Sequence, residues 1–273
     1  MALRTFKTIP LYILSLILLV FTGYPFLYMV LTSFKTQEMF FMDPFSLFVP
    51  VQFSNYVMAF EKGLTSYFVN SFYVTAISVL LIVLFAALAS YPLSRIRFRM
   101  SKVLFMLFVS GMMLPIHSTL IPIFKLTQDM GLYDSLMALL GPYIAFSLPI
   151  SIFILTQFMS ELPREIEEAA EIDGCTHARI FWNIILPMIT PALSTIVIYN
   201  FIHIWTEFIF ALVLITSPEN MTLPLGMQKY YGELTVNVPA LMAALTMASM
   251  PILLVYFFAQ EKIVKGLTGG AVK

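Results

Sequence analysis

Few side chains in this sequence have the chemistry needed for catalysis or for holding a metal ion. The single cysteine, Cys175, and the three scattered histidines form no metal-ligand cluster. The sequence contains no Gly-Lys-Ser or Gly-Lys-Thr phosphate loop and no His-Glu-x-x-His motif. We therefore expect no catalytic residue, no metal and no cofactor in this chain, and any ATP hydrolysis would take place in another subunit.

One acidic residue, Glu207, lies well inside a long apolar run, next to Trp205 and one helical turn from His203. A charge within a membrane segment is costly, so it calls for a functional hypothesis. Glu207 could face a polar path between the spans, together with Trp205 and Asn200. It could equally cap or brace a broken helix through bonds to the backbone or to a neighbouring span. The residues leave both alternatives open.

The composition places these residues in a bilayer. The chain has 273 residues, of which 60% are hydrophobic and 11% charged, whereas a soluble domain carries about 25% charged residues. The mean hydropathy is +0.90. Because the net charge is zero, the chain also lacks the basic footprint of a nucleic-acid-binding protein.

Long runs without charged residues locate the membrane spans, because a transmembrane helix needs about 20 apolar residues. They predict six spans, near residues 10–34, 69–92, 103–124, 136–159, 191–215 and 239–259. The first run is much longer than the core of a signal peptide and is expected to be a retained anchor. Pro115, Pro122, Pro142 and Pro149 interrupt the third and fourth spans and predict either kinks or points of rocking. No internal repeat is found, so one membrane domain over 1–273 is expected.

Lysine and arginine in the loops predict the orientation of these spans. Six spans put both termini on one side, and that side holds eleven basic residues: Arg4, Lys7, Arg95, Arg97, Arg99, Lys102, Arg164, Arg179, Lys262, Lys265 and Lys273. The other side holds four, Lys35, Lys62, Lys125 and Lys229. Both termini and the loop between the fourth and fifth spans are therefore expected to be cytoplasmic.

That loop, residues 161–187, is the most polar stretch of the chain and reads as a hairpin of two short helices. Pro163 suits the first position of a helix, and Gly174 suits the left-handed turn at its end. Thr176 can cap the second helix. Ala169 and Ala170 lie on one helical face, where small side chains would let another surface approach closely.

The hairpin residues resemble the "EAA" loop of ABC-importer permeases. The match runs from Glu168-Ala169-Ala170 through Asp173-Gly174, Phe181, Ile184 and Leu186-Pro187 to Pro191. Cys175 stands where that family often has alanine. The resemblance implies a cytoplasmic coupling helix that docks on an ATPase subunit, and it assigns the ATPase coupling to Glu168, Ala169, Ala170, Asp173, Gly174 and Pro187.

Two further stretches resemble the maltose-type, carbohydrate branch of these permeases. They are Trp205-Thr206-Glu207-Phe208 and the terminal 265–273. The resemblance implies an all-α membrane protein with six transmembrane helices, in the type I ABC-importer permease fold. It also implies a second related permease, two ATPase subunits that bind ATP and Mg, and an extracytoplasmic solute-binding protein. The setting would be the inner membrane of a bacterium or archaeon.

The outer loops are expected to differ in role. Residues 35–68 include several phenylalanines, typical of an interfacial aromatic belt, with a partner contact as the alternative; among them are Phe40, Phe41, Phe45, Phe48 and Phe53. In the related permeases the third outer loop, 216–238 here, faces the binding protein. The resemblance therefore implies that Leu225, Gly226, Lys229 and Tyr230 contact it.

The expected function is thus that of a permease for sugars or oligosaccharides that works by alternating access, and not that of an enzyme. A permease of the same type for glycerol phosphate or polyols is the alternative within the family. An ion-coupled secondary transporter is the alternative from another class, with only Glu207 available for ion coupling and no repeated halves.

Overall fold

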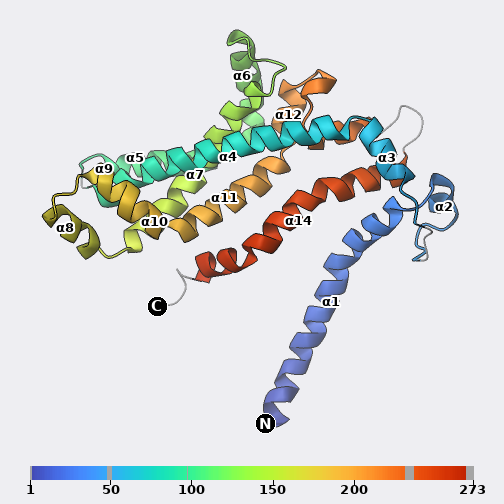
Figure 1. Cartoon of the computed structure of the whole chain (residues 1–273), viewed down its shortest axis with the longest axis horizontal. Helices are drawn as coiled ribbons and strands as arrows, with labels where there is room; N and C mark the ends of the chain where they lie inside the picture. Colours follow the sequence, from blue (N-terminus) through green and yellow to red (C-terminus); the bar gives the residue numbers. More distant parts are fainter. Residues whose placement is uncertain (1, 48–50, 97, 231–236, 269–273) are drawn as a thin grey trace. The chain divides into compact units, whose positions relative to one another are not determined.

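The structure, a computed structural model, describes residues 2–47, 51–96, 98–230 and 237–268, with side chains from 10 to 259 outside the gaps. These residues are helical, and no strand occurs among them. Figure 1 labels the principal elements. In chain order the elements are α1 (Ala2–Ser33), α2 (Gln37–Met42), α3 (Ser54–Glu61), α4 (Leu64–Arg95), α5 (Ser101–Ser110), η1 (Gly111–Met113), α6 (Ile116–Asp129), α7 (Met137–Glu161), α8 (Glu165–Ile172), α9 (His177–Ile180), η2 (Phe181–Ile185), α10 (Leu186–Met188), α11 (Thr190–Trp205), α12 (Ile209–Leu214), η3 (Pro218–Asn220), α13 (Leu223–Gly226), η4 (Met227–Tyr230) and α14 (Val238–Thr268).

The chain divides into two compact units. The first contains Met1–Thr65 and Gly226–Met250, and the second contains Ser66–Leu225 and Pro251–Lys273. The hairpin, residues 161–187, and Glu207 both lie in the second unit.

Four of the six predicted spans lie within single continuous helices. The long apolar stretches are Pro10–Ser33, Leu64–Arg95, Met137–Glu161 and Val238–Ala259. The other candidates are two pairs of helices with a sharp bend between them, Ser101–Met113 with Ile116–Asp129 at 98° and His177–Met188 with Thr190–Trp205 at 73°. The described residues therefore hold four candidate spans, or up to six if each bent pair crosses once.

The third predicted span, 103–124, differs from a straight helix because it breaks before Pro115. Leu114 is extended, with φ −71° and ψ 120°, as expected for a residue whose helical conformation is disfavoured by a following proline. The other prolines predicted to interrupt the third and fourth spans do not break them. Pro122 lies within α6, and Pro142 and Pro149 lie within α7.

The fifth predicted span, 191–215, also differs from one helix. Its long helix, α11, ends at Trp205, and α12 begins only at Ile209. The gap holds Thr206, Glu207 and Phe208, and the sequence left open whether Glu207 caps a broken helix here or faces a polar path. Glu207 is the polar residue that stabilises this break, through bonds to the start of α12.

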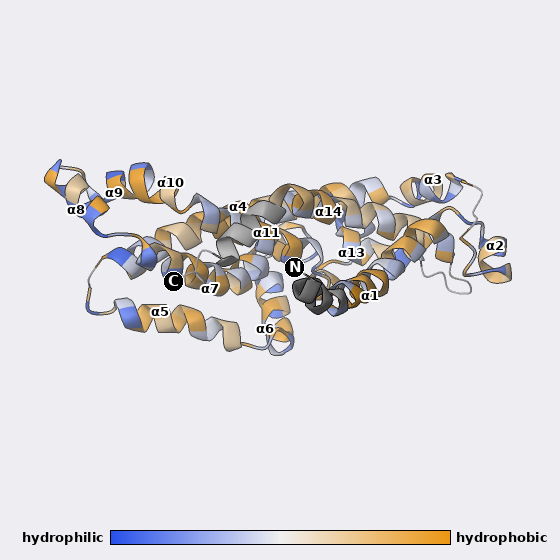
Figure 2. Cartoon of the chain, turned by 90° about the horizontal axis from the view of Figure 1, so that it is seen from below, coloured by the Kyte–Doolittle hydropathy of each residue, from blue (hydrophilic) through white to orange (hydrophobic). Residues whose placement is uncertain are grey.

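Two apolar clusters form the core of the second unit. One joins α4, α7 and α11 to the hairpin and includes Tyr91, Ile152, Ala170 and Phe181. The other joins α4 and α7 to α12 and to Leu225. The first cluster places the hairpin directly against the ends of the long helices, and Figure 2 shows hydrophilic residues gathered at this end of the unit.

The first unit contains a buried lysine. Lys35 is 1% exposed, and its Nζ donates to the carbonyls of Asp43 at 3.1 Å and Pro44 at 2.7 Å. Nearby, Asn55 Nδ2 donates to the carbonyls of Ser33 and Lys35, each at 2.8 Å. These bonds hold Asp43, Pro44 and Asn55 close to the end of α1.

The aromatic residues of this loop divide between packing and exposure. Phe34 packs edge-on against Phe53, with ring centroids 5.7 Å apart, yet Phe53 stays largely exposed, as do Phe41 and Phe45. Phe48 lies outside the described residues. Exposed rings fit the expected interfacial belt and the alternative partner contact equally well.

Candidate functional site

The hairpin has the local structure that its sequence predicts. Gly174 has φ +77°, the left-handed conformation that glycine adopts without steric cost. Thr176 then caps α9, since its Oγ1 accepts from the N–H of Arg179 at 3.4 Å. The prediction for Pro163 is wrong, because α8 begins at Glu165 with Arg164 as its N-cap, so Pro163 lies before the helix and not at its first position. The turn and both helices are thus set by neighbouring residues.

The residues assigned to ATPase coupling do not all lie on the surface. Glu168, Ala169, Asp173, Gly174 and Pro187 are exposed. Ala170, in contrast, is 7% exposed and packs in the apolar cluster beneath the hairpin. The small face expected of the two alanines is therefore divided, because Ala170 packs the hairpin against its own chain and Ala169 is exposed on the outer face.

Two large apolar side chains on the hairpin were missed by sequence reasoning. Ile172 is 87% exposed and Trp182 is 51% exposed. The signal was available in the sequence, because Ile172 falls outside the apolar face of its helix.

A buried ion pair joins the hairpin to α4. Arg95 Nε lies 2.5 Å from Glu167 Oε1, and the two side chains are 2% and 13% exposed. Arg95 Nη2 also donates to the carbonyl of Leu162 at 3.0 Å. Sequence reasoning counted Arg95 only as one of several basic residues in a loop. The two partners lie far apart in the chain, so no local pattern points to the pair.

Glu207 caps a broken helix. Its Oε1 accepts from the N–H of Phe210 at 2.9 Å, and its Oε2 accepts from the N–H of Ala211 at 3.4 Å and from the hydroxyl of Tyr143 at 2.7 Å. The carboxylate therefore satisfies the first free N–H groups of α12 and braces it against α7. Of the two roles considered for Glu207, this arrangement provides the second directly.

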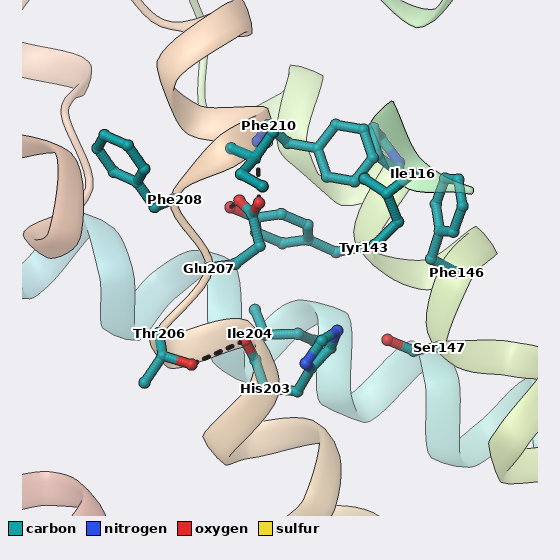
Figure 3. Close-up of a pocket in the computed structure, with 12 residues that line it drawn as sticks. Ile116, Tyr143, Phe146, Ser147, His203, Ile204, Thr206, Glu207, Phe208 and Phe210 are labelled. Atoms are coloured by element: carbon teal, nitrogen blue, oxygen red, sulfur yellow. Dashed lines mark hydrogen bonds between the residues drawn. The ribbon is translucent and has the colours of Figure 1, made fainter. Parts of the chain in front are cut away.

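Glu207 also lies on the wall of a cavity of about 310 Å³. Figure 3 shows its carboxylate beside the Tyr143 ring, below Phe210. The polar side chains of the wall are Tyr143, Ser147, His203, Thr206 and Glu207, and aromatic rings make up much of the rest. Capping the helix and lining a cavity are therefore compatible for this residue.

Neither Trp205 nor Asn200 lines this cavity. Trp205 is buried and packs between Phe68, at 5.2 Å between ring centroids, and Phe201, at 5.6 Å. Asn200 is fully buried between α11 and α7, where its Nδ2 donates to Ser151 Oγ at 2.9 Å. Glu207 is thus the member of the predicted group that reaches the cavity.

The third outer loop presents few of its predicted contact residues. Leu225, Gly226 and Tyr230 are buried, and Lys229 is exposed. The Tyr230 hydroxyl donates to the carbonyl of Ala59 at 3.2 Å, and Lys62 Nζ lies 5.0 Å from the centre of its ring. Leu225, Gly226 and Tyr230 are buried because they pack locally against other residues, and a count of polar and apolar residues does not show this packing. Residues 231–236 of this loop lie outside the described residues.

Asp134 fastens the loop after α6 to the loop after α12. It has φ +57°, and its Oδ1 accepts from the N–H groups of Thr216 and Ser217, each at 2.8 Å. Its Oδ2 accepts from the Ser217 hydroxyl. The hydroxyl of Ser217, followed by the two N–H groups, lowers the pKa of Asp134 below its ordinary value of 3.8. Sequence reasoning gave this residue no role.

No group of three or more histidine, cysteine or acidic side chains is arranged to hold a metal within the described part of the chain.

Comparison with known proteins adds an independent finding. Residues 80–269 match the family described as binding-protein-dependent transport system inner membrane component. The putative ABC transporter permease protein ORF2 of Caldicellulosiruptor sp. (strain Rt8B.4) is 46% identical over 250 residues, which cover 91% of each chain.

Two other relatives carry more specific names. The sulfoquinovosyl glycerol transport system permease protein SmoH of Agrobacterium fabrum is 33% identical, with 96% of this chain and 93% of SmoH covered. The probable starch degradation products transport system permease protein AmyC of Thermoanaerobacterium thermosulfurigenes is 32% identical, with 91% of each chain covered.

A solved structure shows the fold. A chain of a bacterial ABC transporter involved in the import of the acidic polysaccharide alginate superposes with a TM-score of 0.82. It covers 94% of this chain and 96% of its own length, at 24% identity. The expected type I ABC-importer permease fold is thereby confirmed.

Proposed function

Because this chain belongs to the family of binding-protein-dependent transport system inner membrane components, we propose that it is the permease subunit through which an ATP-driven importer moves sugars or oligosaccharides. The chain is a multi-pass inner-membrane permease and not an enzyme, as its relatives are transport permeases. What remains to be proposed is the solute, the mechanism and the role of each surface.

Sugar as the solute is supported by the relatives' names. They concern starch degradation products and a glycoside of glycerol, and the chain matches each of these permeases over nearly its whole length. Glycerol phosphate or a polyol is the neighbouring alternative within the family. An ion-coupled secondary transporter is not favoured, because Glu207 is occupied by three hydrogen-bond donors.

The hairpin is proposed to dock on an ATPase subunit. Support comes from its exposed face, which combines Glu168, Ala169 and Asp173 with the apolar Ile172. ATP and Mg would bind to the two ATPase subunits, and a second, related permease would complete the membrane part. The approach and separation of the ATPases would move the hairpins and alternate the access of solute between the two sides.

The other two surfaces are proposed as parts of the solute path. The cavity beside Glu207 combines aromatic rings with hydroxyl and carboxylate groups, a lining that suits the faces and hydroxyls of a sugar. The third outer loop would meet the solute-binding protein through Lys229, while Leu225, Gly226 and Tyr230 would take part only if the loop rearranged. This scheme needs both termini and the hairpin on the cytoplasmic side.

The single observation that carries the proposal is the exposed helix α8 on a permease whose sequence contains no Gly-Lys-Ser or Gly-Lys-Thr phosphate loop. The test is gentle purification of the tagged chain from its native membranes, followed by mass spectrometry. An ATPase and a second permease in stoichiometric amounts would support the proposal. A homo-oligomer without an ATPase, even after cross-linking, would contradict it and favour the secondary transporter.

The solute is tested next. The binding protein encoded with these subunits would be purified and titrated with mono- and oligosaccharides, glycerol phosphate and polyols in parallel. Tight binding of a sugar alone supports the carbohydrate assignment, and binding of glycerol phosphate or a polyol in its place would replace that assignment while leaving the importer intact.

A further inference from the structure

The last two turns of α4 hold both halves of the hairpin. Arg95 reaches the first half through Glu167 and the carbonyl of Leu162. One turn earlier on the same face, Tyr91 packs against Phe181 of the second half, with ring centroids 5.2 Å apart. Figure 1 shows the hairpin at this end of α4. The hairpin is joined by main chain to α7 and α11, and these contacts add α4 as a third attachment.

The charge of Arg95 matters to this attachment because the pair is buried. Arg95 is the basic partner within 4.0 Å of Glu167 among the described residues. Separating two buried charges is costly, because each would be left without a partner in a poorly solvated place. The pair therefore resists any movement of the hairpin that leaves α4 behind.

The opposite end of α4 is also fastened to a distant segment. Asn70 Nδ2 donates to the carbonyls of Glu219 at 2.7 Å and Met221 at 3.0 Å. Ser71 Oγ accepts from the N–H of Leu223 at 2.7 Å. A helix of 32 residues is about 48 Å long. α4 is thus a rod held by specific bonds at the hairpin and at the loop after α12.

We propose that Arg95 is a positioning residue that fastens the hairpin to α4, so that a displacement of the hairpin moves α4 and the loop after α12 together. This inference rests on the proposed function of the hairpin as the ATPase docking site. It assigns the transmission of movement to the Arg95–Glu167 pair and the two ends of α4, in addition to the main-chain connections.

The test measures whether the hairpin and α4 move as one body. Cys175 is the only cysteine, so Cys175→Ala gives a background for labelling. Nitroxide labels at Leu88→Cys, on the exposed side of α4, and Ala178→Cys, on the exposed side of α9, report one distance. It is measured in the complex purified from native membranes, without nucleotide and after trapping with Mg-ATP and orthovanadate.

Four versions of the chain are compared: the unmodified pair, Arg95→Gln, the charge swap Arg95→Glu with Glu167→Arg, and the control Arg99→Gln. Arg99 is an exposed arginine in the loop that follows α4. For the chain with an intact Arg95–Glu167 pair and for the Arg99→Gln control, we expect one narrow distribution of the distance between the two labels. It should be the same without nucleotide and after trapping. Arg95→Gln should shift or broaden the distribution on trapping while retaining the ATPase, and the charge swap should narrow it again.

Several outcomes would overturn the inference. These are a distance that changes on trapping in the unmodified chain, an Arg95→Gln variant that behaves like the control, and a charge swap that fails to restore the narrow distribution. If the complex with Arg95→Gln does not assemble, the charge swap is compared directly with the unmodified chain. A distance distribution that is not narrow in the charge swap then overturns the inference. If the unmodified complex contains no ATPase, the proposed function fails first and the inference falls with it.

Discussion

Arg95 and Glu207 are both ionisable groups beside an interruption in the helices, and each is held by a different kind of partner. Arg95 is paired with an opposite charge from a distant element, Glu167. Glu207 is held by neutral donors, namely two backbone N–H groups and the Tyr143 hydroxyl. One interaction depends on charge and joins two elements, and the other depends on an acceptor at the start of a short helix.

This difference predicts at which of the two sites the loss of a charge should destabilise the protein. At the hairpin, loss of one charge leaves the other buried and uncompensated. At Glu207, a neutral side chain with an oxygen in the same place could still accept from the backbone of α12. A neutral substitution should therefore destabilise the protein at the Arg95–Glu167 pair and change its stability little at Glu207. Four experiments can break or sharpen this contrast.

The largest effect is expected at the turn of the hairpin. Gly174→Asp places a charge at an exposed position with φ +77°, while a Cβ there would meet no atom within 4 Å. We expect the complex to assemble but to lose stimulation of ATP hydrolysis by solute-loaded binding protein, measured in proteoliposomes. Gly174→Asn is the matched control, because asparagine has the same size and tolerates this conformation. Full stimulation in Gly174→Asp would contradict a docking role for the turn.

The next effect concerns the buried pair. Glu167→Leu alone should lower the free energy of unfolding by about 3 kcal/mol, because Arg95 remains charged and buried. Adding Arg95→Leu should recover most of that loss, since both charges are then absent. Thermal unfolding in detergent measures both variants. If adding Arg95→Leu to Glu167→Leu lowered the free energy of unfolding further, the two side chains would not be coupled.

A smaller effect is expected at the helix cap. Glu207→Ala removes the acceptor for Phe210, Ala211 and Tyr143 and should lower the free energy of unfolding by about 2 kcal/mol. Glu207→Gln keeps an acceptor oxygen, so uptake and thermal stability should stay close to normal. Uptake that fails with glutamine while stability is retained would show that the solute path requires the negative charge, and the contrast with Arg95 would fall.

The smallest effect is expected at Asp134, a charged side chain held, like Glu207, by neutral donors. Its lowered pKa means that its contribution to stability is present above the ordinary value of 3.8 and is lost as the pH falls through the lowered value. Thermal unfolding at pH 6 and near pH 3 should therefore differ slightly more for the unmodified chain than for Asp134→Asn. An identical difference in both chains would show that the carboxylate adds nothing.

The sequence predicted the features that neighbouring residues determine. Gly174 and Thr176 specify the turn and the cap of the hairpin without help from the rest of the chain. The continuous helices follow from apolar length alone. Pro115 marked a real break, because it constrains the residue before it, whereas Pro142 and Pro149 are accommodated within α7.

Features that depend on distant residues could not be predicted. The pairing of Arg95 with Glu167 requires the end of α4 to meet the hairpin, which only the packed structure shows. The acidic Glu207 marked an interruption of an apolar run, but its type and position left both of its possible roles open. Burial of Ala170 and of Tyr230 likewise depends on what packs against them.

The burial of Lys35 affects how the topology of this protein can be mapped. Impermeant amine reagents identify the outer side of a membrane protein by the lysines that they modify, and four lysines are predicted to face that side. Lys35 Nζ is bound to two carbonyls and is shielded from solvent, so it should remain unmodified on whichever side it lies. Lys125 and Lys229 are exposed, and the orientation is best determined from them.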